Sequence, residues 1–360
     1  MCAPSATADE LALIVEARGV ADDLLDRYFR LGVGKAMNLR TPGGFNRAVT
    51  RLAALLRSRA SASDHAAVKA AVEVLDVDWG RTTADQRRTL IARALAAAGR
   101  KTTGVPQKVE TVFGKAADEV VRAGRDGARR DQRLAIAADF NALDRRVIRH
   151  LRASQANYVR DEYGRRHEAF GEQARRIVAD GLEAGLGRDD LARDLEAAAE
   201  GIIAGRSSFY WDVVAGSFVA RGRSFAQLSA YAEAGLQRYR IVAVLDEVTT
   251  PTCRFLDGKT FAVSRGLELF DRVEAAPERL EELNPWVREQ EDAKTGRRSL
   301  YVERGGDRVS VAEIARSGFG TRDDRGEFTR GLGDRELGDL GIGFPPYHGL
   351  CRTTTVGDVQ

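Results

Sequence analysis

Apolar residues recur at helical spacing along most of the first 236 residues. This spacing places them on one face of a helix, which buries that face in a core. The pattern predicts helices over residues 8–31, 45–60 and 64–75, and a further helix that opens at Thr82–Asp85 and continues through Ala98. Ser61–Ser63 is a predicted break, after which Asp64 is a plausible N-cap.

After another predicted break at Lys101–Pro106, the chain becomes rich in arginine. Between Arg122 and Arg166 there are 12 Arg against six acidic residues, so this stretch is basic although the net charge is only +3. Ile136 and Phe140 begin an apolar helix face that leaves the arginines on the other faces. These arginines are candidates for contact with DNA or an acidic partner: Arg129, Arg130, Arg145, Arg146 and Arg149. The alternative is a solvated face that the interleaved acids balance.

Three more helices are predicted before residue 236. The first covers residues 168–184 and is closed by Gly185–Gly187. The second starts at Arg188, with acidic residues in its first turn. The third is Ser208–Glu233, which ends before Gly235, a residue well suited to stop a helix.

From residue 237 the apolar period changes to that of strands and turns. The predicted elements are strands at 238–245, 259–263 and 353–356, a turn at 250–252, helices at 277–283 and 285–291, and a hairpin of 299–304 with 308–311. Asp257–Gly258 is a hairpin signal. Residues 318–343 are rich in glycine and charge, which predicts a mobile surface loop.

These patterns predict an α+β protein, in which a long, mainly helical N-terminal region precedes a small C-terminal antiparallel-sheet domain. The 43% hydrophobic content is enough for a packed core. Three cysteines cannot form a disulfide framework, so a reducing compartment is expected. Neither a secretory signal nor an apolar run long enough to cross a membrane is visible, so no membrane partner is expected.

Two of the three cysteines and one of the four histidines lie in two short segments. The first segment is 246–261, which reads DEVTTPTCRFLDGKTF, and the second is 344–356, which reads FPPYHGLCRTTTV. Together they resemble the C-terminal motif of the phage Mu F-like, or phage head morphogenesis, family of minor capsid proteins. The residues that carry the resemblance are Asp246, Thr250, Cys253, Leu256, Asp257, Gly258, Lys259, Pro345, Pro346, His348, Cys351 and Arg352.

The resemblance covers about the last third of the chain, plus the helix that leads into it. The apolar pattern predicts a helical region at 1–100 and a long Arg-rich helical region at 101–236. The resemblance implies a Mu F-like module at 237–360 with an insertion at about 267–343. It further implies a minor head protein of a phage or prophage, which associates with portal and capsid or scaffold proteins, meets packaged DNA, and supports head morphogenesis and DNA delivery. Its expected location is the capsid interior, or the bacterial cytoplasm during virion assembly.

Cys253, His348 and Cys351 are candidate metal ligands, because thiolates and imidazole suit zinc or iron. A structural zinc wants four ligands, so Asp246 or Asp257 would have to complete the set. Some family members carry a second cysteine where this chain has Leu256. The alternative is that the cysteines are small buried residues and that His348 holds the last strand by a hydrogen bond. A Cys–His catalytic pair is a third alternative.

Two other functions are consistent with the sequence. Related C-terminal modules also occur in bacterial toxins, so the chain is alternatively a toxin or effector-type protein. It is also a candidate nucleic-acid-binding adaptor that uses the Arg-rich helices. An enzyme is not expected, since the chain has no GxxxxGK[ST] loop and no compact cluster of acids with a Lys or His.

Overall fold

The computed structural model describes residues 37–204 and 207–358, and the helix predicted over 8–31 lies outside these ranges. By its internal contacts, Asn38–Gln360 is one compact unit. Its architecture is α+β, as the sequence predicts: a bundle of long helices is followed by a part with two antiparallel sheets.

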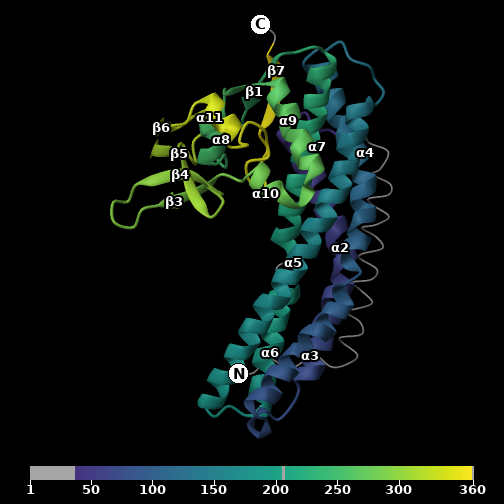
Figure 1. Ribbon diagram of the computed structural model, residues 1–360, viewed down its shortest axis with the longest axis vertical. Coiled ribbons are helices and arrows are strands. Elements are labelled where there is room, and N and C mark those ends of the chain that lie inside the picture. Colours follow the sequence, from purple (N-terminus) through teal and green to yellow (C-terminus); the bar gives the residue numbers. More distant parts are fainter. Residues whose placement is uncertain (1–36, 205–206, 359–360) are drawn as a thin grey trace. The chain divides into compact units, whose positions relative to one another are not determined.

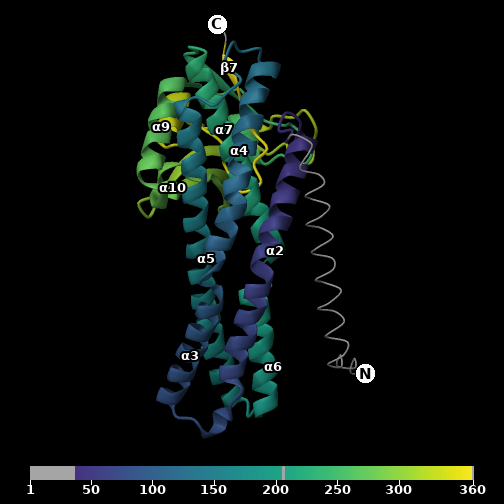
Figure 2. The same ribbon diagram turned by 90° about the vertical axis from the view of Figure 1, so that its right-hand side faces the viewer.

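The bundle is built from helices that run side by side (Figures 1 and 2). They are α2 (Pro42–Leu75), α3 (Ala84–Thr102), α4 (Val105–Asp131), α5 (Ala142–Glu183), α6 (Arg188–Ala199) and α7 (Ser207–Glu233), with a 3₁₀ turn η1 (Trp79–Arg81) and a π-helical segment η2 (Glu200–Ala204). Helix α2 packs on α3, α4 and α7, and α5 packs on α3, α4, α6 and α7. Apolar side chains of α2, α3, α5 and α6 form a core around Trp79 and Phe170.

Three of these helices begin at a polar residue whose side chain caps the first turn. The side chain of Thr41 accepts from the Gly44 N–H, and Pro42 follows in the first turn. Thr83 and Asn141 each form a reciprocal capping box with the residue three positions later. The start predicted at Thr82–Asp85 is therefore confirmed.

The break predicted at Ser61–Ser63 is wrong, because α2 continues through it. Asp64 is not an N-cap but a buried residue that accepts from the Tyr163 hydroxyl at 2.6 Å. Ser63 accepts from Lys108 Nζ at 2.8 Å. Ser63 and Asp64 are thus partnered by side chains of other helices.

The predicted boundaries of α5 are also wrong. Ile136 and Phe140 lie in the connection before α5, and the helix continues through residue 168 without interruption. The connection is held to the end of α7, where Glu233 accepts from Ala137 N at 2.7 Å and from Asn141 Nδ2 at 2.7 Å. The Ala137 N–H and the Asn141 side-chain amide thereby have hydrogen-bond partners in a segment that is not helical.

Helix α7 is the most buried helix among the described residues, and it has the predicted extent. Its two inner glycines are close contact points. A Cβ at Gly222 would lie 2.5 Å from Val120 Cγ1, and one at Gly216 would lie 2.6 Å from the Gly349 carbonyl oxygen. Gly235, with φ of +72°, ends the helix as predicted.

Two antiparallel sheets follow α7. The first has the order β2 (Thr260–Ala262), β1 (Arg238–Val242), β7 (Thr354–Asp358), so the last strand pairs with the first, with Arg240 opposite Val356. The second has the order β3 (Arg288–Glu291), β4 (Arg298–Arg304), β5 (Asp307–Arg316), β6 (Glu327–Thr329). The predicted β4–β5 hairpin is confirmed.

Four short-range predictions in this part are wrong. The turn predicted at 250–252 begins a helix, α8 (Pro251–Leu256), so Asp257–Gly258 follows a helix and does not form a two-residue hairpin. Helix α9 (Val263–Ala275) was not predicted; η3 (Pro277–Arg279) and α10 (Leu280–Leu283) follow it. Residues 288–291 form a strand, not a helix. The predicted loop at 318–343 contains β6 and α11 (Asp334–Asp339).

Among the described residues, no helix combines the length and the apolar character needed to cross a membrane.

Candidate metal centre at the split motif

The first half of the motif is a loop and a short helix. Thr250 caps α8 with its Oγ1, which accepts from Cys253 N at 3.4 Å, and Pro251 occupies the first helical position. At the other end, the Asp257 carboxylate accepts from Ala243 N at 3.0 Å. Gly258 follows with φ of +83°, a conformation that favours glycine. The helix is thereby fixed against β1.

The second half of the motif lies against α7. Its Pro345–Pro346 peptide bond is cis, and Tyr347 is fully buried. His348 and Cys351 are joined by a turn in which Cys351 N donates to the His348 carbonyl at 3.2 Å. The guanidinium of Arg223, on α7, donates to the carbonyls of Arg352 at 2.9 Å and Thr353 at 2.8 Å.

The fold brings Cys253, His348 and Cys351 together. Cys253 Sγ lies 3.2 Å from His348 Nε2 and 3.8 Å from Cys351 Sγ. One ligand atom from each residue lies within 4.8 Å of the others. Both cysteines are buried and His348 is half-buried. Two sulfurs and one imidazole nitrogen at this separation form a donor set suited to a soft or borderline cation.

The two thiols differ in acidity. A hydrogen bond from Cys351 lowers the pKa of the Cys253 thiol. Burial, and then the same hydrogen bond, raise the pKa of Cys351 well above its usual range.

Neither candidate aspartate completes the ligand set. Asp246 binds the Arg352 guanidinium through both carboxylate oxygens, at 2.7 and 2.6 Å, and this interaction lowers its pKa to about 2. Asp257 is paired with Arg325 at 2.9 Å and with the Ala243 N–H. Leu256 is fully buried. Of the His, Cys, Asp and Glu residues that the structure describes, three form the cluster.

The Asp246–Arg352 pair is a second link between the two halves of the motif. Thr249 Oγ1 also donates to Asp246 Oδ1 at 2.8 Å. Lys259 extends the motif toward α11, since its Nζ lies 3.4 Å from Asp334 Oδ1 and 5.0 Å from the centre of the Phe255 ring. The charged motif residues thus hold the loops around the cluster.

Sequence reasoning missed Arg254, which is buried beside Cys253. Its guanidinium donates to the carbonyls of Asp246 at 2.6 Å, Thr249 at 3.0 Å and Thr321 at 2.9 Å, and also to that of Asp324. One side chain therefore joins the loop before α8 to the loop before β6. The chain is so rich in arginine that this residue type by itself gave no signal.

The five candidate arginines of the helical region have different surroundings. Arg146 forms ion pairs with Asp271, at 2.7 Å, and Glu274 of α9. Arg129 pairs with Asp126, and Arg145 donates to the Phe140 carbonyl at 3.0 Å. Arg130 and Arg149 are exposed.

Comparisons with protein-family models, with curated proteins and with solved structures gave no match.

Proposed function

We propose that this chain is a minor head protein of a phage or prophage, which associates with portal and capsid proteins during head morphogenesis. The observation that carries the proposal is the meeting of the two motif halves. Cys253 and His348 are 95 positions apart in the chain, yet their side chains are in contact. Asp246 and Arg352, which belong to the same resemblance, form an ion pair.

The contacts support the resemblance because residues of its two segments bind to one another. A chance similarity in two distant segments gives no reason for their polar residues to pair across the gap. Here the first half supplies Asp246, Thr250 and Cys253, and the second half supplies Arg352, His348 and Cys351 to meet them. The two segments that carry the resemblance thus form one site.

The long helices are the proposed surface for portal, capsid or packaged DNA. Arg130, near the end of α4, and Arg149, on α5, are exposed. Arg146 is a weaker candidate, because its charge is already balanced by Asp271 and Glu274. The proposed location is the capsid interior, or the bacterial cytoplasm during assembly.

Co-sedimentation of the full chain with procapsids or purified portal from the same genome tests this proposal. We expect a few copies to sediment with each particle. If the exposed arginines take part, the double variant Arg130→Gln, Arg149→Gln binds more weakly, and salt weakens the unsubstituted protein. The matched control is Arg175→Gln, Arg176→Gln, which removes two exposed charges near the other end of α5, the helix that carries Arg149. Protein that remains in the supernatant contradicts the head-protein assignment and favours an effector or adaptor.

We also propose that Cys253, His348 and Cys351 hold a zinc ion. The two sulfurs and the imidazole fit this ion, and the missing fourth protein ligand leaves a position for water or a partner's side chain. Zinc would supply a cross-link between the two motif halves.

Metal content of the purified chain decides this point. We expect about one zinc per chain, lost in Cys351→Ser and kept in the matched control Cys2→Ser. Equal, near-zero metal in all three samples would leave the cluster as a hydrogen-bonded core.

A further inference from the structure

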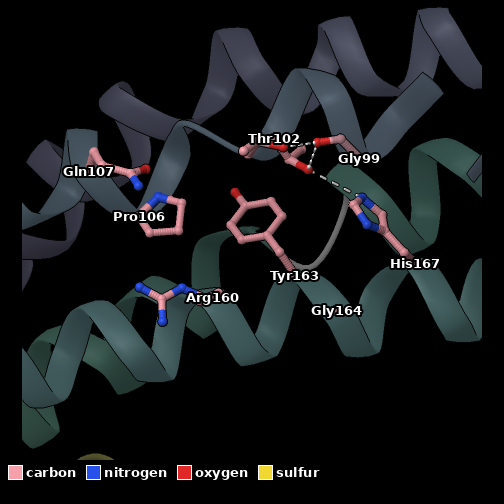
Figure 3. A pocket seen from close by; sticks show the side chains of 9 residues that line it. Gly99, Thr102, Pro106, Gln107, Arg160, Tyr163, Gly164 and His167 are labelled. Carbon is pink, nitrogen blue, oxygen red and sulfur yellow. Dashed lines mark hydrogen bonds between the residues drawn. The ribbon is translucent and has the colours of Figure 1, made fainter. Parts of the chain in front are cut away.

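A hydroxyl lies beside an imidazole in the bundle, and a thiol lies beside an imidazole in the split motif. The hydroxyl is that of Thr102, whose Oγ1 lies 3.4 Å from His167 Nε2 in a cleft of about 340 Å³ between the α3–α4 junction and α5 (Figure 3). It already donates to a backbone carbonyl of its own helix, at 3.3 Å. The thiol of Cys253 differs, because a second thiol, that of Cys351, is also in contact with it. Two sulfurs in contact have a reaction open to them that the hydroxyl lacks.

The two sulfurs are close enough to bond after a small movement. Cys253 Sγ lies 3.8 Å from Cys351 Sγ, although 98 positions separate the two residues in the chain. Both are buried and both are free thiols. The sulfurs of a disulfide lie about 2.05 Å apart, so each sulfur has to move by about 0.9 Å. Rotation of the two side chains produces a shift of this size.

The backbone next to each cysteine is held in place. Arg254 donates to the carbonyl of Asp246, in the first segment of the motif, at 2.6 Å. Arg223 donates to the carbonyl of Arg352, the residue after Cys351, at 2.9 Å. Asp246 and Arg352 then join the two segments through their side chains, at 2.6 Å. These contacts keep the two sulfurs facing each other.

We propose that Cys253 and Cys351 are a redox pair, which mild oxidation joins in a disulfide between the two motif halves. With hydrogen peroxide as the oxidant, one thiol attacks a peroxide oxygen, the O–O bond breaks, and a sulfenic acid and water form. The second thiol attacks the sulfenic sulfur, the S–S bond forms, the S–O bond breaks, and a second water leaves. The peroxide takes the two electrons, and the two thiol protons leave in the water molecules.

The disulfide and a metal ion exclude each other. Zinc binds cysteine as a thiolate, which neither sulfur of a disulfide can supply, so oxidation releases a bound ion. This release rests on the proposed zinc site, whereas the disulfide rests on the contact between the two sulfurs. The timing rests on the proposed head-protein function: the thiols persist in the reducing cytoplasm, and the bond forms after a particle has left it.

The test uses the full chain carrying Cys2→Ser, in which Cys253 and Cys351 are the two remaining cysteines. The protein is treated with a chelator, then with a small molar excess of hydrogen peroxide, and its mass and its peptides are measured. We expect a monomer that has lost two hydrogen atoms, a peptide that joins Cys253 to Cys351, and full reversal by dithiothreitol. Unchanged thiols, disulfide-linked dimers without the internal bond, or sulfinic acid at either cysteine would overturn the proposal.

Thermal unfolding of the same samples measures what the bond does to the fold. A cross-link across 98 positions restricts the unfolded chain, so the unfolding midpoint of the oxidised monomer should rise by at least about 3 °C and return on reduction. Cys351→Ser in the same background should stop at the sulfenic acid, which dimedone traps, with no such rise. An oxidised monomer no more stable than the reduced one, or an equal rise in Cys351→Ser, contradicts the cross-link.

A zinc-loaded sample separates the redox pair from the proposed metal site. We expect a chromogenic chelator to record about one released zinc for each disulfide formed. A chain that binds no zinc and still forms the disulfide refutes the metal site and supports the redox pair. Zinc retained by the oxidised monomer overturns the exchange. None of these measurements requires portal or capsid, so failure of the head-protein assignment would change only the timing.

Discussion

Buried arginines have different partners within the helical bundle and around the split motif. In the bundle, Arg125 pairs with Asp144 at 2.8 Å and Glu233 at 2.9 Å, and it also donates to the Ala137 carbonyl, in the irregular connection before α5, at 2.8 Å. Around the motif, Arg223 and Arg254 bond to backbone carbonyls. Regular helices satisfy their own carbonyls, so a buried guanidinium there needs carboxylates. The loops of the motif leave carbonyls without partners, and arginine supplies the donors.

Arg166 supports this comparison from within the bundle. It pairs with Glu162 at 3.1 Å, as a bundle arginine should, but it also donates to the Ile203 carbonyl at 3.2 Å. Ile203 lies in the π-helical segment η2, where the regular hydrogen-bond ladder is interrupted. For the buried arginines named here, the carbonyls that accept lie in irregular backbone. The half-exposed Arg152 differs, because it donates to the Gly114 carbonyl within α4 at 3.0 Å.

The largest expected effect is that of Arg254→Met. Four carbonyls would lose their donor, so we expect the free energy of unfolding to fall by about 4 kcal/mol. Arg254→Lys keeps the charge but cannot span both loops, and should lose about half as much. Urea unfolding measures both. A loss below about 1 kcal/mol for Arg254→Met would show that water replaces the guanidinium without penalty.

A somewhat smaller effect is expected for Arg125→Met, because it leaves Asp144 buried without its cation. We expect a loss of about 3 kcal/mol in unfolding free energy. Adding Asp144→Asn should recover at least half of it, since the stranded charge is then removed. No such second substitution can rescue Arg254→Met, whose partners are backbone groups. A double variant no more stable than Arg125→Met would contradict this distinction.

One carboxyl group in each region, Asp64 in the bundle and Asp246 in the motif, should change the stability of the fold with pH in opposite directions. Burial raises the pKa of Asp64 to about 6, so the folded state binds a proton that the unfolded state has released. Its contribution to stability is present below about pH 4 and is lost as pH rises through 6, by about 3 kcal/mol. Asp246, with its pKa lowered to about 2, behaves oppositely: its contribution is present above about pH 4 and is lost as pH falls toward 2.

Unfolding of Asp64→Asn and of the unsubstituted chain, compared at pH 4 and pH 8, measures the first contribution. We expect the variant to gain stability relative to the unsubstituted chain as pH rises, since Asn can still accept from Tyr163. A constant difference between the two proteins across this range would contradict the buried-acid interpretation.

The smallest expected effect concerns a half-exposed arginine. Arg146 joins α5 to α9 through Asp271 and Glu274. Arg146→Gln should cost only about 0.5 kcal/mol, because solvent and salt screen such pairs. A loss of several kcal/mol would mean that solvent exposure does not indicate how much these arginines contribute to the free energy of unfolding.

Local rules were enough to predict some elements of the fold. The start of α3 at Thr83, the end of α7 at Gly235 and the β4–β5 hairpin follow from capping, positive φ and strand alternation. The Cys/His cluster was found because rare residue types gathered in two segments. Spacing in the sequence could not show that Asp246 is taken by Arg352 instead of joining the cluster.

The remaining features depend on partners far away in the chain. Asp64 was predicted to begin a helix, because an aspartate beside serines is typical of an N-cap; its real partner is Tyr163, 99 positions later. Ile136 and Phe140 continued a helical period into a segment that bonds to Glu233 instead. Helix α9 was not predicted, and Arg254 could not be told from the many solvent-facing arginines.

The pairing of β7 with β1 sets an order of events during synthesis. Strand β1, helix α8 and Cys253 leave the ribosome well before His348, Cys351 and β7 do. Until then one edge of β1 has no partner, and the loop that holds Cys253 lacks Arg352. A growing chain therefore passes through a stage with an open strand edge and an exposed thiol, features that favour misassociation. Once β7 and the segment before it are available, β1 gains its second partner strand and Cys253 gains His348 and Cys351 as neighbours.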